Sequence, residues 1–127
     1  KAASNIAMEV FVVDNNSVDG SVKMVESKFP EVKLIANKEN LGFSKANNQA
    51  IKKAQGEYIL LLNPDTVVEE DTFSSCISTL DKDSKIGGLG VKMLDGKGTF
   101  LPESKRGLPT PAVAFYKIFG QTLHMPV

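Results

Sequence analysis

The sequence predicts an α/β fold with a mostly parallel sheet, because short apolar runs rich in β-forming residues alternate with segments of helical periodicity. The chain has 127 residues, the length of one domain, and 42% of them are hydrophobic, which is enough for one ordinary core. The predicted order is strand, helix, strand, helix, strand, helix, strand, at residues 8–13, 21–28, 32–36, 43–55, 58–62, a helix that begins near the acidic residues 69–71, and 86–91.

The first strand and helix follow from an apolar run and the turn residues after it. The run 8–13 is typical of a strand buried on both faces, and the polar residues 14–17 then predict a turn. Ser17 or Asp19 can cap the next helix, and Pro30 ends it.

The middle of the chain repeats this pattern. A short strand at 32–36 leads into a polar loop at 37–42, and an alanine-rich apolar stripe predicts a helix over 43–55. Gly56 follows as the expected C-terminal cap of that helix. The run 58–62 (YILLL) is the most apolar of the predicted strands.

The last third is less regular. The acidic residues 69–71 complement the dipole of a helix whose apolar side chains recur at helical spacing within 73–80. A glycine-rich strand is predicted at 86–91, and the sequence DGKG at 95–98 predicts a hairpin turn. From Pro102 onward the chain is proline-rich and predicted to be irregular.

Charge and cysteine content exclude several classes of protein. Fifteen basic residues balance fifteen acidic ones, so no strong field attracts nucleic acid or an anionic membrane. The single cysteine, Cys76, cannot form an intramolecular disulfide, and it is typical of a small buried side chain in a reduced, cytoplasmic setting. No apolar run approaches the roughly 20 residues of a membrane-spanning helix.

Two acidic loop motifs come directly after predicted strands. Asp14 follows the first strand, and Asp65 follows the run 58–62. Ligands of open α/β sheets bind where the carboxyl ends of the strands give way to loops. We therefore expect Asp14 and Asp65 to lie at the same edge of the sheet.

Asp65 is a candidate metal ligand. Mg²⁺ and Mn²⁺ accept one or two protein carboxylates and complete their shell with water and substrate phosphates. Such a cation can neutralise a diphosphate leaving group. The alternative is that Asp65 only tightens the turn after Pro64.

Asp14 and Asn15 are candidates for contact with a nucleobase. A uracil or thymine ring offers one N–H donor and two carbonyl acceptors, which suit a carboxylate and an amide nitrogen. The alternative is an Asx turn and a helix cap formed by residues 14–19.

The segment 40–48 combines a loop glycine with asparagines in a helix. Gly42 allows the backbone to approach a ligand or to turn sharply. Asn47 and Asn48 are unfavourable in an ordinary helix interior, which suggests a role beyond folding. An exposed polar face is the alternative.

Read together, these segments resemble the family 2 glycosyltransferases of the GT-A fold. Each segment is modest alone, but their order and spacing also match, and the tail LPESKRGLPTP at 101–111 resembles a bacterial branch that includes rhamnosyltransferases. The matching segments are VVDNNSVDGS at 12–21, NLGFSKANNQAI at 40–51 and GEYILLLNPDT at 56–66.

The resemblance implies a three-layer α/β/α, Rossmann-like domain and a reaction. A sugar passes from a nucleoside diphosphate donor, UDP- or dTDP-linked, to a glycan or lipid-linked acceptor with inversion. A carboxylate general base deprotonates the acceptor hydroxyl. The resemblance thus implies a bacterial enzyme of surface polysaccharide synthesis, placed in the cytoplasm and peripheral to the inner membrane in the full-length protein.

The resemblance also assigns roles to individual residues. Asp65 would bind the divalent cation, Mg²⁺ or Mn²⁺, although NPD at 63–65 stands where the family has a DXD motif. Asp14 and Asn15 would contact the base. The residues implied in donor binding are Asp14, Asn15, Asn40, Gly42 and Asn48.

The departures from the family pattern carry expectations of their own. No strand with a base-cradling loop precedes residue 8, and the general base and the acceptor half are expected beyond Val127, so residues 1–127 would form a partial GT-A domain. We expect the isolated chain to be inactive, because a positioned base contributes about 10²–10⁴-fold to rate. A missing strand leaves an open sheet edge, through which two copies of the chain could pair.

Two alternatives remain open at this stage. The chain could be a module that binds a nucleotide or nucleotide sugar without chemistry. It could also be a nucleotidyltransferase of related architecture, although no glycine-rich basic loop of that class is present in the sequence.

Overall fold

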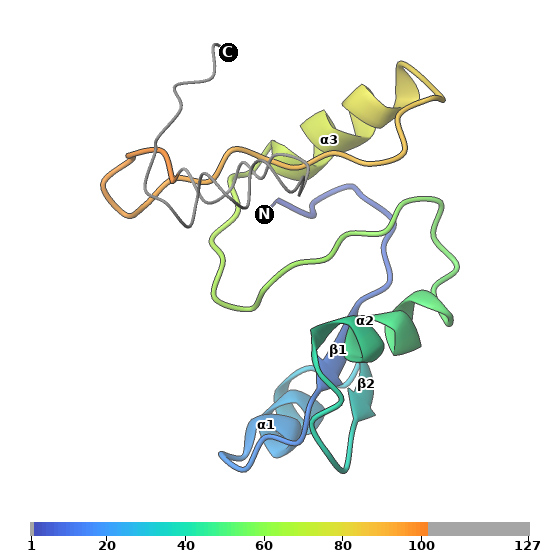
Figure 1. Ribbon diagram of the computed structural model, residues 1–127, viewed down its shortest axis with the longest axis vertical. Coiled ribbons are helices and arrows are strands. Elements are labelled where there is room, and N and C mark those ends of the chain that lie inside the picture. Colours follow the sequence, from blue (N-terminus) through green and yellow to red (C-terminus); the bar gives the residue numbers. More distant parts are fainter. Residues whose placement is uncertain (1, 102–127) are drawn as a thin grey trace, which may run out of the picture. The chain divides into compact units, whose positions relative to one another are not determined.

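The computed structural model describes residues 2–101 (Figure 1). The chain divides into two compact units, Lys1–Asp83 and Ser84–Val127. The helices and strands of the described part all belong to the first unit. They are β1 (Phe11–Asp14), α1 (Ser21–Lys28), β2 (Lys33–Ala36), α2 (Phe43–Ile51) and α3 (Thr72–Asp81).

β1 and β2 form a parallel pair. Val12 lies opposite Leu34 and Asp14 lies opposite Ala36, and α1 connects the two strands. The backbone bond from the amide of Asn37 to the carbonyl of Asp14, 2.9 Å long, extends the ladder past the last pair. A parallel pair needs such a crossover, so the observed βαβ unit confirms the α/β class.

α1 has the predicted bounds but a different cap. Its N-cap is Gly20, in the left-handed conformation at φ 86°, and not Ser17 or Asp19. The carboxylate of Asp19 instead accepts the amide of Ser21 at 3.0 Å, one residue inside the helix. The helix ends at Lys28, because a residue that precedes a proline disfavours the helical conformation.

α2 is shorter than predicted. It ends at Ile51, with Lys52 as its C-cap, so the expectation that it reaches residue 55 and is capped by Gly56 is wrong. Beyond Ile51 a final turn continues, because the amides of Lys53 and Ala54 both donate to the carbonyl of Ala50 at 2.9 Å. The amide of Gly56 then donates to a side chain of another segment. The buried residue of α2 is Ala46, and that of α1 is Val25.

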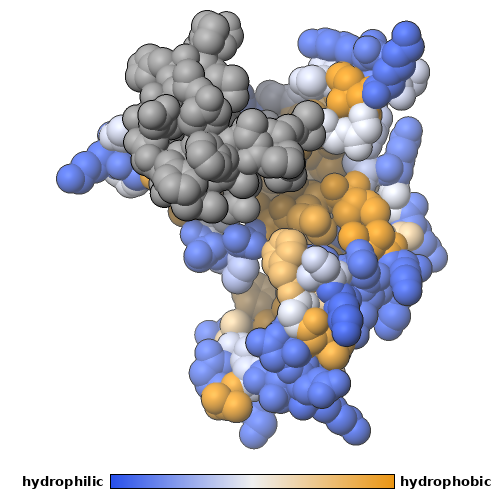
Figure 2. All heavy atoms as spheres, in the orientation of Figure 1, coloured by the Kyte–Doolittle hydropathy of each residue, from blue (hydrophilic) through white to orange (hydrophobic). Residues whose placement is uncertain are grey.

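The predicted strands at 58–62 and 86–91 do not join the sheet. Among residues 2–101 the sheet consists of β1 and β2. The side chains of 58–62 are between 39% and 59% exposed, and Figure 2 shows hydrophobic atoms at the surface in view. An apolar run becomes a buried strand only if a strand edge pairs with its backbone and other layers cover both faces. Among the residues that the structure describes, no strand pairs with either run, and side chains of both runs remain exposed.

α3 follows the acidic residues 69–71, as predicted. Its N-cap is Asp71, and the hydroxyl of Tyr58 donates to the carboxylate of Asp81 in its last turn. Cys76 on this helix is half-buried and carries a free thiol. Within the described part of the chain, no helix has the length and apolar character needed to cross a membrane.

The second unit contains the predicted hairpin turn. Asp95 accepts the amides of Lys97 and Thr99 through Oδ1, each at 2.8 Å, and Leu94 forms an antiparallel bridge with Phe100. Gly98, at φ 79°, supplies the left-handed conformation that the turn requires. The hairpin is confirmed, whereas the irregular segment predicted from Pro102 lies outside the described residues.

Candidate functional site

The carboxyl ends of β1 and β2 carry the polar residues that the sequence singles out. The loop after β1 runs through residues 15–20, and the loop after β2 runs through 37–42. Because the two strands are parallel and paired in register, both loops leave the same edge of the sheet. The candidate site is built where they meet.

Asp14 closes a turn immediately after β1. Its Oδ2 accepts the backbone amides of Asn16 at 3.0 Å and Ser17 at 2.9 Å, while Asn16 takes the left-handed conformation at φ 74°. Hydrogen bonds from Ser17 lower the pKa of the Asp14 carboxyl below its ordinary value of 3.8. Asp14 is therefore an ionised, half-buried acceptor, and both backbone bonds fall on a single one of its oxygens.

Asn15 joins the two loops through three hydrogen bonds. Its Oδ1 accepts the backbone amide of Leu41 at 3.1 Å and the side-chain amide of Asn37 at 3.3 Å. Its Nδ2 donates to Oδ1 of Asn40 at 2.9 Å. The side chain thus connects the end of β1 to the first residue and to the last part of the loop after β2.

Asn40 links Asn15 to the start of α2 through a further hydrogen bond. Its Oδ1 accepts the backbone amide of Gly42 at 2.9 Å, in addition to the bond from Asn15. Gly42 is the N-cap of α2 and has φ 77° and ψ 166°. That region of backbone conformation is essentially restricted to glycine, which explains the residue type at this position. Asn15, Asn40 and Gly42 are therefore brought together by these hydrogen bonds.

Asn48 lies apart from this hydrogen-bonded group. It is exposed on α2, while its neighbour Asn47 donates to the carbonyl of Phe43 at 2.9 Å, one turn earlier in the same helix. Asn47 thus has a local structural role. Next along the helix, Oε1 of Gln49 is buried and accepts no hydrogen bond from the described residues.

Asp65 occupies a turn and does not follow a strand. The amide of Thr66 donates to the carbonyl of Asn63 at 3.2 Å, with Pro64 in the position that favours such a turn. The expectation that Asp65 follows a strand is wrong, so the strand-end rule does not place Asp65 at the sheet edge where Asp14 lies. The carboxylate is exposed, and residues 2–101 contain no group of three or more His, Cys, Asp or Glu that could hold a metal ion.

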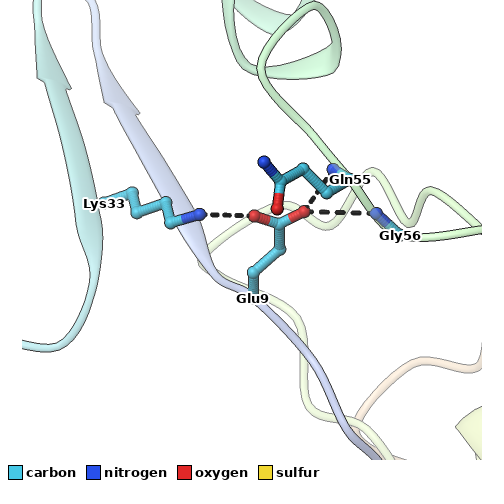
Figure 3. A network of polar contacts seen from close by, with 4 residues as sticks. All are labelled: Glu9, Lys33, Gln55 and Gly56. Atoms are coloured by element: carbon cyan, nitrogen blue, oxygen red, sulfur yellow. Dashed lines mark hydrogen bonds and ion pairs between the residues drawn. The ribbon is translucent and has the colours of Figure 1, made fainter.

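Glu9 anchors the opposite end of β1, and sequence reasoning missed it. Figure 3 shows its carboxylate between the ammonium of Lys33, 2.6 Å away, and the backbone amides of Gln55 and Gly56. These contacts, the bond to Lys33 first, lower the pKa of Glu9 below 4.5. The signal that could have found the pair is the opposite charge of residues at the starts of neighbouring strands.

Asn37 is the second residue that sequence reasoning missed. It is the first residue after β2, and it is half-buried beside Asn15. The rule that places ligand-binding residues at the carboxyl ends of parallel strands applies to Asn37 as it does to Asp14. The sequence predicts the polar loop at 37–42, but nothing in its composition distinguishes the first residue of that loop from the others.

Comparisons with known proteins give a consistent result. The family model for "Glycosyl transferase family 2" matches residues 2–123. The chain is 35% identical over 78 residues to the minor teichoic acid biosynthesis protein GgaB of Bacillus subtilis, covering 59% of this chain. It is 24% identical over 115 residues, 82% of this chain, to the N-acetylglucosaminyl-diphospho-decaprenol L-rhamnosyltransferase of Mycobacterium tuberculosis H37Rv.

A third relative extends the same pattern. The chain is 33% identical over 100 residues, 76% of its length, to the succinoglycan biosynthesis protein ExoO of Rhizobium meliloti. The matches cover only 9% of GgaB, 38% of the rhamnosyltransferase and 29% of ExoO, so this chain spans a minor part of each relative. No solved structure matches it significantly.

Proposed function

Because this chain belongs to glycosyl transferase family 2, whose domain has the Rossmann-like GT-A fold, we propose that it binds the nucleotide-sugar donor of a bacterial glycosyltransferase. The enzyme would transfer a sugar from a nucleoside diphosphate to a glycan or lipid-linked acceptor with inversion. Relatives named for the biosynthesis of minor teichoic acid and succinoglycan support a place in surface polysaccharide synthesis. The full-length protein would act in the cytoplasm or beside the inner membrane.

One observation carries the donor-binding proposal. Ionised Asp14 lies directly beside the group in which Asn15, Asn40 and Gly42 are joined by hydrogen bonds. This group stands at the carboxyl ends of two parallel strands, where α/β sheets bind their ligands. Asn48 would contact the donor from α2, apart from this hydrogen-bonded group.

Asp14 suits the recognition of a uracil or thymine base. Both rings present an N–H donor between two carbonyl oxygens. Its lowered pKa keeps Asp14 ionised at neutral pH, and its two backbone bonds occupy Oδ2, so Oδ1 can accept from the ring. Cytosine has no such donor at that position, so the carboxylate would favour UDP or dTDP over CDP.

Asp65 would supply a carboxylate to a divalent cation. Its carboxylate is exposed, so it would be accessible to a cation that takes its other ligands from phosphate and water. Mg²⁺ or Mn²⁺ would neutralise the negative charge of the diphosphate leaving group.

The similarity to the mycobacterial rhamnosyltransferase supports a finer proposal, a deoxyhexose or hexose donor carried on dTDP or UDP. The family mechanism calls for a carboxylate that deprotonates the acceptor hydroxyl. None of the residues assigned above has that role in this proposal.

The test is calorimetric titration of the chain with UDP and with dTDP, each with and without Mn²⁺, repeated with Asp65→Ala. The matched control is Glu69→Ala, which removes another exposed carboxylate close by in the chain. We expect binding that Mn²⁺ strengthens in the wild type and in Glu69→Ala but not in Asp65→Ala. Absence of binding by either nucleotide would contradict the donor-site proposal, and equal effects of both variants would remove Asp65 from the metal site.

A further inference from the structure

We propose that Asn15 is the positioning residue of the donor site, which holds the loop 37–42 against the end of β1 in place of a direct contact with the base. This inference rests on the donor site proposed above and gives one of its residues a different task. It follows from the three hydrogen bonds that meet at one side-chain amide.

The acceptor capacity of Asn15 is already used within the protein. An amide oxygen has two lone pairs. Oδ1 of Asn15 accepts from the backbone of Leu41 at 3.1 Å and from the side chain of Asn37 at 3.3 Å. One of the two N–H groups of Nδ2 donates to Asn40. Only a single N–H of this half-buried side chain remains, so Asn15 has little left with which to read a base edge.

The partners of Asn15 show what the side chain controls. Asn37 begins the loop after β2, and Leu41 stands next to the glycine that starts α2. Oδ1 of Asn40 accepts both from Asn15 and from the amide of Gly42, so the position of Asn15 also restricts the position of Gly42. The path of the loop, and with it the point at which α2 begins, is therefore set from the end of β1.

A positioning role and a direct contact with the base predict different selectivity. If Asn15 acts through the loop, its loss weakens the binding of UDP and CDP by the same factor, because the loop does not distinguish the two bases. If Asn15 contacts the base, its loss changes the ratio of the two affinities. Under this second alternative, the removal of Asn40, which has no assigned contact with the base ring, leaves the ratio of UDP to CDP affinity unchanged.

The experiment compares Asn15→Ala, Asn15→Asp, Asn40→Ala and the double alanine variant, with Lys38→Ala as the matched control. Lys38 lies in the same loop and is exposed. We expect Asn15→Ala and Asn40→Ala each to lower the affinity for UDP and the affinity for CDP by the same factor. The double variant should lose no more affinity than the weaker-binding of the two single variants. Lys38→Ala should bind as the wild type does.

Amide hydrogen exchange, measured by NMR in the absence of nucleotide, supplies a second readout. In Asn15→Ala, the amide of Leu41 should exchange roughly threefold to tenfold faster, the factor that corresponds to one net hydrogen bond. In Asn15→Asp, the amide of Leu41 keeps its acceptor and should stay protected, whereas the amide of Gly42 should lose protection because the carboxylate repels Oδ1 of Asn40.

The outcomes separate this inference from the donor-site proposal. Unchanged exchange at Leu41 and Gly42 in Asn15→Ala would overturn the positioning role, and so would a changed ratio of UDP to CDP affinity that Asn40→Ala does not share. If the wild-type chain binds neither nucleotide, the donor site fails, while the exchange rates still decide whether Asn15 holds the loop.

Discussion

Glu9, which lies just before β1, and Lys33, the first residue of β2, form an ion pair at 2.6 Å between Oε2 and Nζ. The other carboxylate oxygen of Glu9 accepts the backbone amides of Gln55 and Gly56 (Figure 3). One side chain therefore fastens β2 and the segment after α2 to the beginning of β1. The candidate site lies at the far end of the same strands, so this anchor supports the site without being part of it.

Glu9→Gln should lower the free energy of unfolding at neutral pH and have less effect in acid. The pKa of Glu9 in the folded chain lies below 4.5, so the folded state binds this proton less tightly than the unfolded state does. The stabilisation is therefore complete above pH 4.5 and is lost as the pH falls through the lower pKa of the folded chain. Urea unfolding of both proteins from pH 7 to pH 3 tests this.

The matched control for Glu9 is Glu26→Gln, which neutralises an exposed glutamate on α1. This variant should unfold at the urea concentration of the wild type at neutral pH. A constant difference between Glu9→Gln and the wild type at every pH would show that the charge of Glu9 contributes nothing.

Gly42→Ala should destabilise the chain by about 1–3 kcal/mol, the cost of holding an ordinary residue in a sparsely populated backbone conformation. Space is not the cause, because an added Cβ at Gly42 meets no atom within 4 Å. Gly90→Ala is the control, since its Cβ also meets nothing within 4 Å and its backbone has no positive φ. Thermal unfolding should separate the two variants, and equal melting temperatures would argue against strain at Gly42.

Asp14→Asn should weaken UDP binding by roughly tenfold to a hundredfold, the factor that corresponds to a hydrogen bond with a charged group. The amide can still close the turn to Asn16 and Ser17, so the fold should persist. Asp19→Asn is the control, because Asp19 is also a turn carboxylate with a lowered pKa but has no place in the proposed site. A comparable loss in Asp19→Asn would count against recognition of the base by Asp14.

The pH dependence of UDP binding offers an independent check on Asp14. Its pKa lies below 3.8 because of hydrogen bonds from Ser17, so the carboxylate stays ionised from pH 7 down to pH 5. The UDP affinity of the wild type should therefore have the same pH dependence over that range as the UDP affinity of Asp14→Asn. A fall in affinity that occurs only in the wild type would mean that Asp14 titrates near neutrality, contrary to its hydrogen bonding.

We expect the chain to self-associate at high concentration, because its exposed strand edges and exposed apolar side chains can bind those of a second copy. β1 pairs only with β2 among the described residues, and the side chains of Leu60 and Leu61 are 59% and 52% exposed. Leu60→Lys should reduce any association seen by sedimentation. Val67→Lys, at a valine that is 94% exposed, should reduce it less. A wild type that stays monomeric at high concentration would contradict the expectation.

The local elements were largely predictable. The helix at 21–28 follows from its apolar spacing and from Pro30, and the turn at 95–98 follows from its turn residues. The parallel arrangement of the first two strands follows from the alternation of elements. All of these signals act over short stretches of sequence. The candidate residues Asp14 and Asn15 were found by the rule that places ligands at the carboxyl ends of parallel strands. Asn40 and Gly42 were assigned to the site by the resemblance to family 2 glycosyltransferases.

The errors share one physical origin. The run 58–62 has the composition of a buried strand, but composition cannot supply the neighbouring edge and covering layers that a buried strand requires. The helix predicted to reach residue 55 ends at Ile51, and the amides of Gln55 and Gly56 bond instead to a glutamate 46 and 47 residues away in sequence. Sequence periodicity has no information about such distant partners.

The sequence by itself therefore determined the α/β class, the family, the order of the helical segments and which polar residues stand at the strand ends. Only the tertiary structure decided that Asn15 bonds to Asn37, Asn40 and Leu41, that Glu9 fastens three segments together, and that Asp65 stands in a turn and not at a strand end. The reason is that hydrogen bonds between residues 22 to 47 positions apart depend on how the strands pair, and that pairing is a property of the folded chain.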